Sequence, residues 1–277
     1  MANHSPKIFL LGVGAQKAGT SWLHEQLNQR DDADFGFLKE YHILDAMFLD
    51  EFKSFHPQPT FPWKWRTWRR YRFTQKPDRY FNYFAKLLKR QRIKLTGDIT
   101  PSYGRLQPET FQWVREQFRQ RNIKTKAVFL MRDPIERILS QQRMKLRKAG
   151  TLEPENEIDQ LRKAAAKLSR QQSKRSDYLS TLKNLKAAFG SDDLFVDLYE
   201  NLFNKSTFQR LCDFLLIDYI QPDWCLRVNQ SRATTSTPDD ILRTIGFSQR
   251  DTYQGVAQMC PELNLEQLWP TASRWCR

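Results

Sequence analysis

Short apolar runs alternate with amphipathic stretches along most of the chain. Runs with the length and apolar content of buried strands lie at 7–13, 34–38, 94–100, 126–131 and 194–199. Segments with helical spacing lie at 21–29, 79–91, 109–118, 133–148, 155–172 and 176–189, and a further one ends at 216. This alternation predicts an α/β fold, with a central parallel β-sheet flanked by helices.

Helix ends are marked in the sequence at two places. Asp133 and Pro134 form a cap and first-turn pair that opens the helix to Lys148. Gly190 is placed to close the helix at 176–189. Beyond 216 come a loop containing Pro and Thr and a weakly patterned tail, without a repeat, a low-complexity linker or a clear boundary. We therefore expect a single domain over residues 1–277.

The charge balance narrows the class of partner. The net charge is +14, which favours an anionic partner: nucleic acid, a phosphorylated cofactor, an acidic polymer or an anionic membrane. Charge alone does not choose among these four. The 40% content of hydrophobic residues is enough for a sizeable core.

Cysteines and apolar runs exclude some classes of site. The four cysteines form no C-x-x-C pair and have no accompanying histidine cluster, so we expect no zinc site and favour reduced thiols over one disulfide. No run of about 18 apolar residues predicts a membrane span. The run IFLLGV is too short for a signal peptide and lacks a cleavage site. If Met1 is the true start, the expected location is cytoplasmic.

The segment GVGAQKAGTSW is close to a phosphate-binding loop but departs from it. A Walker A loop reads G-x-x-x-x-G-K-[ST], and here Gly14 and Gly19 have the required spacing while Thr20 takes the place of the lysine. Ser21 fits the pattern, and a lysine is present inside the loop, as Lys17. A glycine-rich turn between strand and helix directs backbone N–H groups at one point and holds phosphate. The alternative is an ordinary turn between a strand and a helix.

A nucleotide triphosphatase would also need a carboxylate that holds magnesium at the end of another strand. Asp98 and Asp197 are the only candidates, and neither resembles that carboxylate. Asp98 precedes a polar Thr-Pro-Ser turn, and Asp197 lies in the middle of its predicted strand. A sulfuryl group carries fewer negative charges than a phosphoryl group, so one well-placed lysine could stand in for the metal.

Four blocks together resemble sulfotransferases that use 3′-phosphoadenosine 5′-phosphosulfate (PAPS). They are GAQKAGTSWL, LKEYHILD, TGDITPSYGRL and KAVFLMRDPIERILSQQRMKLR, and they occur in the order that the family shows, over about half the chain. The resemblance implies the P-loop NTPase-like sulfotransferase fold. It also implies PAPS as donor, adenosine 3′,5′-bisphosphate (PAP) as product, and catalysis without a metal. The acceptor would be a hydroxyl or amine of a small molecule or glycan, which the sequence does not identify.

The resemblance assigns roles in binding the donor. Lys17 would contact the oxygen that bridges the 5′-phosphate and the sulfuryl group, where charge develops as the bond breaks. Arg132 and Ser140 would bind the 3′-phosphate, while Arg137 is expected in a structural salt bridge. The full set of expected donor-binding residues is Lys17, Ala18, Gly19, Thr20, Ser21, Trp22, Arg132 and Ser140.

The same resemblance assigns the catalytic groups. Glu40, which would follow the second strand, is the expected general base, and Lys39 is expected to bind the sulfuryl oxygens. His42 is the rival base. Asp98, Ser102 and Tyr103 are candidates for contact with the substrate. Asp98 replaces the family's usual Glu, and Tyr103 has an alternative role in the core.

Two further segments are candidates for the site. RVNQS (227–231) resembles the family's Asn-Ser segment, and the loop to Thr237 is expected to close over the donor. FPWKWRTWRRYRF (61–73) combines basic and aromatic residues that could bind single-stranded nucleic acid, an anionic membrane or an acceptor, or could cover the core. A role beside the acceptor is the leading functional interpretation, and no nucleic-acid partner is expected. The rival functions are a P-loop kinase or NTPase and a non-enzymatic polyanion-binding protein.

Overall fold

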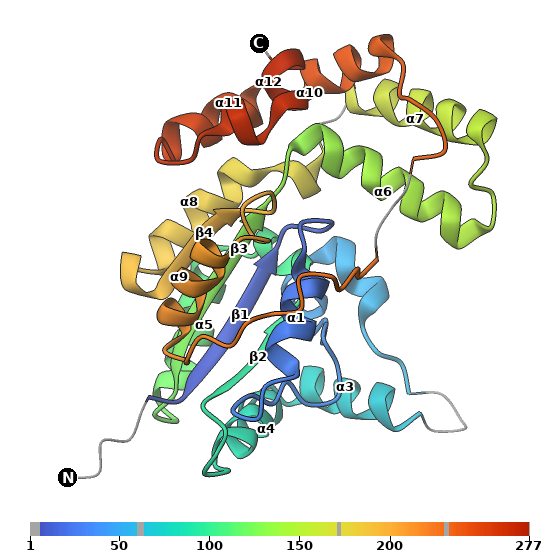
Figure 1. Cartoon of the computed structure of the whole chain (residues 1–277). Helices are drawn as coiled ribbons and strands as arrows, with labels where there is room; N and C mark the ends of the chain where they lie inside the picture. The colour runs from blue at the N-terminus through green and yellow to red at the C-terminus, as the bar shows by residue number, and fades with distance from the viewer. Residues whose placement is uncertain (1–5, 60–63, 171–172, 230–232, 277) are drawn as a thin grey trace.

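A computed structural model describes residues 6–59, 64–170, 173–229 and 233–276 (Figure 1). Four strands form one parallel sheet in the order β2-β1-β3-β4. Their bounds are β1 (Ile8–Gly14), β2 (Leu95–Ile99), β3 (Lys124–Met131) and β4 (Leu194–Leu198). The chain passes to one side of β1 to form β2 and to the other side to form β3. Ligands of open α/β sheets bind where the strand order reverses in this way, outside the carboxyl ends of the strands.

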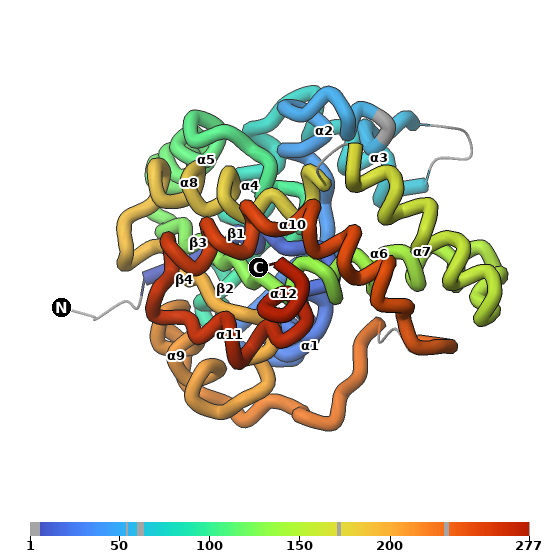
Figure 2. The backbone as a smooth tube through the Cα atoms, turned by 90° about the horizontal axis from the view of Figure 1, so that it is seen from above, coloured from blue at the N-terminus to red at the C-terminus, as the bar shows by residue number. Residues whose placement is uncertain are grey.

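Helices surround this sheet. The α-helices are α1 (Thr20–Asn28), α2 (Leu44–Phe48), α3 (Trp65–Gln75), α4 (Asp78–Leu88), α5 (Pro108–Arg119), α6 (Pro134–Ala149), α7 (Pro154–Leu168), α8 (Tyr178–Ala188), α9 (Lys205–Leu215), α10 (Asp239–Met259), α11 (Leu265–Leu268) and α12 (Pro270–Trp275). Short 3₁₀ helices are η1 (Asp50–Phe55), η2 (Pro101–Arg105), η3 (Lys174–Ser176) and η4 (Ser191–Asp193). Figure 2 shows α4, α5 and α8 on one side of the sheet and α1 and α9 on the other. The α/β fold with a central parallel sheet is therefore confirmed.

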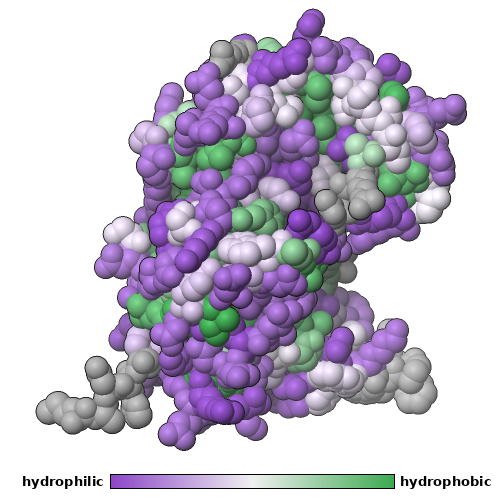
Figure 3. All heavy atoms as spheres, viewed as in Figure 1, coloured by the Kyte–Doolittle hydropathy of each residue, from purple (hydrophilic) through white to green (hydrophobic). Residues whose placement is uncertain are grey.

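Aromatic side chains join the layers. Phe9 of β1 packs on Phe84 of α4 and stacks on Phe118 of α5, with ring centroids 4.9 and 3.9 Å away. On the opposite side, Trp22 of α1 packs on Phe208 of α9, with centroids 5.7 Å apart. All seven residues of β1 are buried, so this strand is the centre of the core. The face seen in Figure 3 is mostly hydrophilic, with apolar side chains in separate patches.

The long C-terminal helix α10 was not predicted, because its buried face is mixed. Ile241, Ile245 and Val256 are buried at helical spacing, but Gln249 and Thr252 complete the same face and hide the apolar pattern. The helix packs with α6, α7, α8 and α12 above the carboxyl ends of the strands (Figure 1). These helices cover the region in which the strands end.

The predicted strand at 34–38 is wrong. Only Ala33 pairs with Leu95, in an isolated bridge, and the chain then turns. Asp34 accepts a hydrogen bond from the N–H of Gly36 (2.8 Å), which has φ +76°, a conformation that favours glycine. The apolar residues of this run pack in the aromatic core instead of pairing in the sheet, as the buried Phe35 shows. Glu40 therefore lies on a loop.

Two helix ends also differ from the prediction. The helices expected at 155–172 and 176–189 are α7 (Pro154–Leu168) and α8 (Tyr178–Ala188). Gly190 has φ −73° and is not a left-handed cap, whereas Gly150 at the end of α6 has φ +69°. Asp133 does cap α6, since its carboxylate accepts from the N–H groups of Ile135 and Glu136.

No helix in the described part of the chain is long and apolar enough to cross a membrane. The four cysteines, Cys212, Cys225, Cys260 and Cys276, are all free thiols. Among the described residues, no group of three or more His, Cys, Asp or Glu side chains is placed to hold a metal ion.

Candidate active site

One large pocket lies at the carboxyl ends of the strands, with a volume of about 830 Å³. It brings together segments that are far apart in the sequence. The residues singled out from the sequence that line it are Lys17, Gly19, Thr20, Ser21, Trp22, Lys39, Glu40, His42, Ser102, Arg132 and Ser140. Ala18, Asp98 and Tyr103 do not line it; the N–H of the buried Ala18 donates to the carbonyl of Ala15 (3.2 Å).

The glycine-rich loop has an unusual backbone conformation. It joins the end of β1 to the start of α1, and three of its residues have positive φ: Gly14 (+133°), Lys17 (+70°) and Gly19 (+77°). A Cβ atom on Gly19 would lie 2.8 Å from Leu202 Cδ2, so the loop packs too closely there for a larger residue. Successive backbone N–H groups in such a turn, at the positive end of a helix, form a concave site for anions.

Lys17 occupies a strongly positive position in this loop. Its Nζ atom lies 3.4 Å from the carbonyl oxygen of Asn229. Burial, followed by the nearby charges of Arg147, Arg132 and Lys148, lowers the pKa of Lys17 to about 8. A cation that is partly desolvated among other cations gains when an anion binds beside it.

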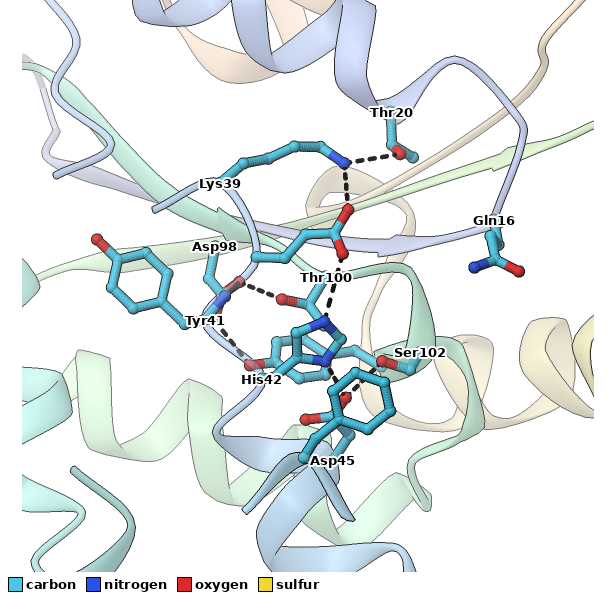
Figure 4. Close-up of polar contacts among 12 residues, drawn as sticks. Gln16, Thr20, Lys39, Tyr41, His42, Asp45, Asp98, Thr100 and Ser102 are labelled. Atoms are coloured by element: carbon cyan, nitrogen blue, oxygen red, sulfur yellow. Dashed lines mark hydrogen bonds and ion pairs between the residues drawn. The ribbon is translucent and has the colours of Figure 1, made fainter. Parts of the chain in front are cut away.

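Glu40 is held between two cationic side chains. Its Oε1 atom lies 2.6 Å from Lys39 Nζ, and its Oε2 atom lies 3.3 Å from His42 Nε2. Lys39 Nζ also donates to Thr20 Oγ1 at 3.3 Å, which links this group to the loop (Figure 4). Burial raises the pKa of Glu40, but hydrogen bonds from His42 and Lys39 outweigh burial and lower the pKa to about 2.

His42 lies between two carboxylates. Its Nδ1 atom is 2.6 Å from Asp45 Oδ2, and Asp45 also accepts a hydrogen bond from Ser102 Oγ (Figure 4). Burial lowers the pKa of His42, but the hydrogen bonds with Asp45 and Glu40 outweigh burial and raise the pKa to about 9. Asp45 was not among the residues predicted for this site, although it belongs to the LKEYHILD block.

Asp98 and Tyr103 lie behind the wall of the pocket, and both are fully buried. The Asp98 carboxylate accepts from the hydroxyl groups of Thr100 (2.6 Å), Tyr103 (2.7 Å) and Tyr80 (2.9 Å). Burial raises the pKa of Asp98 to about 6 despite these hydrogen bonds. The Tyr103 hydroxyl also accepts from the N–H of Ile43 at 3.1 Å. These two residues therefore position the loop that carries Glu40, and they do not reach the pocket.

Arg132 and Ser140 reach the pocket from the other side of the loop. Arg132 Nη1 donates to the carbonyl of Lys17 at 3.2 Å, and its guanidinium lies 4.8 Å from the ring centroid of Tyr199. Ser140 lies on α6 and is buried. The expected salt bridge of Arg137 is wrong: Arg137 is fully buried and donates to neutral oxygens, including Ser176 Oγ at 2.8 Å.

Basic residues from several other elements also line the pocket. Among its described lining residues, nine are Lys or Arg and only Glu40 is acidic. Five of the nine were not predicted: Arg105, Arg147, Lys148, Lys174 and Arg175. Arg105 and Arg147 lie inside two of the four blocks, whereas the net charge of +14 was the only signal for the other three.

The segment after α9 closes one side of the pocket. Trp224 stacks on Trp22 with centroids 5.8 Å apart, and Arg227, Val228 and Asn229 line the pocket. The remainder of the RVNQS block lies outside the described residues. After it, Thr237 accepts a hydrogen bond from Arg143 Nη2 at 3.2 Å.

The basic aromatic stretch is described from residue 64 onward and forms most of α3; positions 61–63 lie outside the described residues. Arg70 of this helix donates to the carbonyl of Tyr41 (2.6 Å) and so supports the loop that carries Glu40 and His42. Trp65 is 52% exposed and Phe73 is buried. The stretch therefore combines core cover with an exposed surface.

Solved structures of similar fold are sulfotransferases. A sulfotransferase from Alicyclobacillus acidocaldarius matches with a TM-score of 0.55 and 16% identity, over 92% of this chain and 95% of that chain. The sulfotransferase domain of the Synechococcus PCC 7002 olefin synthase matches with a TM-score of 0.47 and 14% identity, over 88% and 95%. The sulfotransferase domain from the curacin biosynthetic pathway matches with a TM-score of 0.46 and 16% identity, over 84% and 83%.

No protein-family model matches the chain, and the search of curated proteins found no match. At these identities the structural likeness concerns the fold. The chain has the sulfotransferase fold, an α/β domain with a four-stranded parallel sheet flanked by helices.

Proposed function

We propose that the protein is a sulfotransferase that moves the sulfuryl group of PAPS to a hydroxyl or amine of an acceptor. The observation that carries the proposal is the meeting of Lys17, Lys39 and Glu40 in one pocket, at the mouth of an anion-binding loop. A single domain over 1–277 would supply the whole site. The acceptor would be a small molecule or a glycan.

The donor would lie in the pocket from the loop toward α6. When bound, PAPS supplies the sulfuryl group on its 5′-phosphate. The backbone of Gly19, Thr20 and Ser21 would hold that phosphate, and Lys17 would stabilise charge on the oxygen that leaves. Arg132 would hold the 3′-phosphate with two parallel hydrogen bonds, assisted by Ser140.

The indole of Trp22 also bears on whether the pocket suits a polar ligand such as the donor. Its buried Nε1–H has no hydrogen-bond partner among the described residues, and the ring lines the pocket. A buried donor group without a partner costs free energy, and a polar atom of a bound ligand would remove that cost.

Glu40 is favoured over His42 as the base. Both ring nitrogens of His42 face carboxylate oxygens, and its pKa of about 9 keeps the ring protonated at neutral pH. Glu40 is ionised, and its side chain is 37% exposed against 16% for His42. Lys39 is shared between Glu40 and the loop, so movement of Lys39 toward the sulfuryl oxygens would raise the basicity of Glu40. Glu40 would then accept the proton of the acceptor as its oxygen attacks sulfur.

The two rival functions have less support from this arrangement. A P-loop kinase or NTPase needs a carboxylate free to hold magnesium. Glu40 is the one acidic side chain among the described lining residues, and it is paired with Lys39 and His42, while Asp98 is buried behind the wall. A polyanion-binding protein has no need of a carboxylate held at the mouth of the loop.

A thermal-shift titration tests the proposal. PAP at about 100 times its dissociation constant should stabilise the protein by about 2.7 kcal/mol, which is a shift of several degrees. ATP with magnesium and adenosine 5′-phosphate should give smaller shifts at equal concentration. A larger shift with ATP and magnesium would favour a kinase, and no shift with either nucleotide would favour a polyanion-binding protein.

A further inference from the structure

The pocket continues beyond Glu40, on the side away from the phosphate loop. His42 stacks on Phe55 with ring centroids 4.5 Å apart, and Phe55 contacts Phe52 at 5.7 Å. The guanidinium of Arg105 lies 5.6 Å from the centroid of Phe52. This part of the pocket therefore has an aromatic wall that begins at the loop carrying Glu40. The wall is lined by His42, Phe52, Phe55 and Arg105.

Three basic side chains border the same part of the pocket: Arg105 of η2 and Lys174 and Arg175 of η3. We call these three residues the acceptor rim. Arg105 and Lys174 both pair with one carboxylate, that of Glu51. Arg175 donates a hydrogen bond to the neutral Gln16 side chain. The acceptor rim with Glu51 therefore has a net charge of +2.

Arg175 is the least compensated member of the acceptor rim. It is half-buried, and burial followed by the charge of Arg105 lowers the pKa of Arg175, while Glu40 partly offsets this. It makes no ion pair with any described residue. Its charge also lowers the pKa values of Arg137 and Lys145. A desolvated guanidinium among cations is costly unless an anion pairs with it.

Other cations surround the loop where the donor would bind. Lys17 feels the charges of Arg132, Arg147 and Lys148, which together surround the phosphate loop and α6. Arg175 borders both parts of the pocket: it is coupled to Arg105 and Glu40, and it donates to Gln16 of the loop. Glu40 lies between the loop, which it reaches through Lys39 and Thr20, and the aromatic wall, which it reaches through His42.

We propose that the acceptor is itself an anion: a ring-containing hydroxyl compound with a carboxylate or sulfate group that Arg175 binds. This inference rests on the proposed sulfotransferase function. The planar guanidinium matches either oxyanion with two parallel hydrogen bonds. Phe52 and Phe55 supply an apolar face for the ring. Glu40 lies between this face and the loop, so it directs the hydroxyl toward the donor.

The reaction balances with these groups. The acceptor oxygen forms a bond to sulfur as the bond from sulfur to the bridging oxygen of PAPS breaks, and PAP leaves with that electron pair. The proton of the acceptor hydroxyl moves to Glu40 and then to solvent. The anionic group of the acceptor stays bound to the acceptor rim throughout and takes no part in bond making.

The test uses three probes that differ in one substituent: 4-hydroxybenzoate, 4-hydroxybenzenesulfonate and the neutral 4-hydroxybenzamide. Their binding to the full chain loaded with PAP is measured by ligand-observed NMR at physiological ionic strength. We expect the carboxylate, the sulfonate or both to bind at least about 10-fold tighter than the amide, since hydrogen bonds to charged groups are strong. Which of the two anions binds tighter identifies the group that the acceptor carries.

Arg175→Gln should reduce the preference for anions to within about 3-fold, whereas Arg175→Lys should keep a part of it. Arg119→Gln is the matched control, because Arg119 is exposed on α5 and pairs with Glu116; it should leave the preference unchanged. Equal binding of the amide, binding of none of the probes while PAP binds normally, or an equal loss in Arg119→Gln would overturn the proposal. Failure to bind PAP at all would instead contradict the proposed function.

Arg175→Gln is also assayed with PAPS, to separate a role in donor binding. The substitution could weaken the binding of PAPS more than that of PAP and leave the preference for anionic probes intact. In that case Arg175 contacts the sulfuryl group, and the assignment to the acceptor is wrong.

Discussion

In the proposed reaction, the charge state of His42 decides which side chain is able to accept the acceptor's proton. A ring with both nitrogens bound to carboxylates and a pKa of about 9 carries its proton at pH 7 to 8 and is unable to act as the base. Asp45→Asn replaces one of the two carboxylates with a neutral group of the same size. We expect the pKa of His42 to fall toward its ordinary value of 6.5 in this variant.

The size of the effect on stability follows from the shift in the pKa of His42. A pKa raised from 6.5 to about 9 corresponds to about 3 kcal/mol of preference for the charged ring in the folded protein. Because the folded pKa lies above the unfolded one, this contribution is fully present below pH 6.5 and is lost as the pH rises through about 9. The difference in unfolding free energy between the unmodified protein and Asp45→Asn should therefore shrink between these two pH values.

NMR titration of the imidazole Cε1–H signals measures the pKa directly. The chain has only four histidines, and His42→Gln assigns the signal of interest. Asp50→Asn is the control, since Asp50 is an exposed neighbour that pairs with Lys53 and should leave His42 unchanged. A pKa between 6 and 7 for His42 in the unmodified protein would refute the reasoning, and this measurement holds even if Asp45→Asn does not fold.

Three further predictions concern the donor site and the chemistry. Arg132→Ala should weaken binding of PAP about 10- to 100-fold while barely changing that of adenosine 5′-phosphate; equal losses by calorimetry would contradict a 3′-phosphate contact. Affinity for PAP should fall as the pH rises through about 8, where Lys17 loses its proton, and Lys17→Ala should abolish this dependence; a pH profile that is the same in both proteins would assign the titration to another group. Glu40→Gln should bind PAP normally and lose roughly 10²–10⁴-fold in turnover; an active Glu40→Gln beside an inactive, PAP-binding His42→Ala would reverse the two roles. Turnover of the unmodified protein should survive EDTA; activity that EDTA removes and magnesium restores would favour a kinase.

The features that could be predicted from the sequence are those formed by short contiguous segments. The strand β1, the loop after it and the helix α1 are contiguous, so spacing and glycine placement were sufficient to predict their form. The same holds for the strand β3 and the helix α6, with Asp133 as its cap. Parallel strands bring the ends of such blocks to one edge, and the residues of the pocket were expected there because the blocks resemble those of PAPS-dependent sulfotransferases.

The features that were missed depend on contacts between distant segments. The apolar run at 34–38 has the composition of a strand, but Phe35 is buried in the core, Phe37 packs on Tyr83 of α4, and the chain turns at Gly36. Arg105 and Lys174 meet through Glu51, across three separate 3₁₀ helices, and no local pattern marks such a cluster. Tertiary packing decided both cases, and a local pattern does not contain that information.

Two side chains of the proposed active site, Lys17 and His42, lie on left-handed backbone with φ of +70° and +52°. This conformation costs a residue other than glycine about 1–3 kcal/mol, so it persists only where the surrounding structure enforces it. Arg132 fixes the carbonyl of Lys17, and Arg70 fixes the carbonyl that precedes His42. These contacts come from the chain's own residues, so in the proposed reaction the donor would not have to supply the order of the loop and of the Glu40 segment. Binding energy is then available for the groups that react, which is the condition for stabilising a transition state more than a ground state.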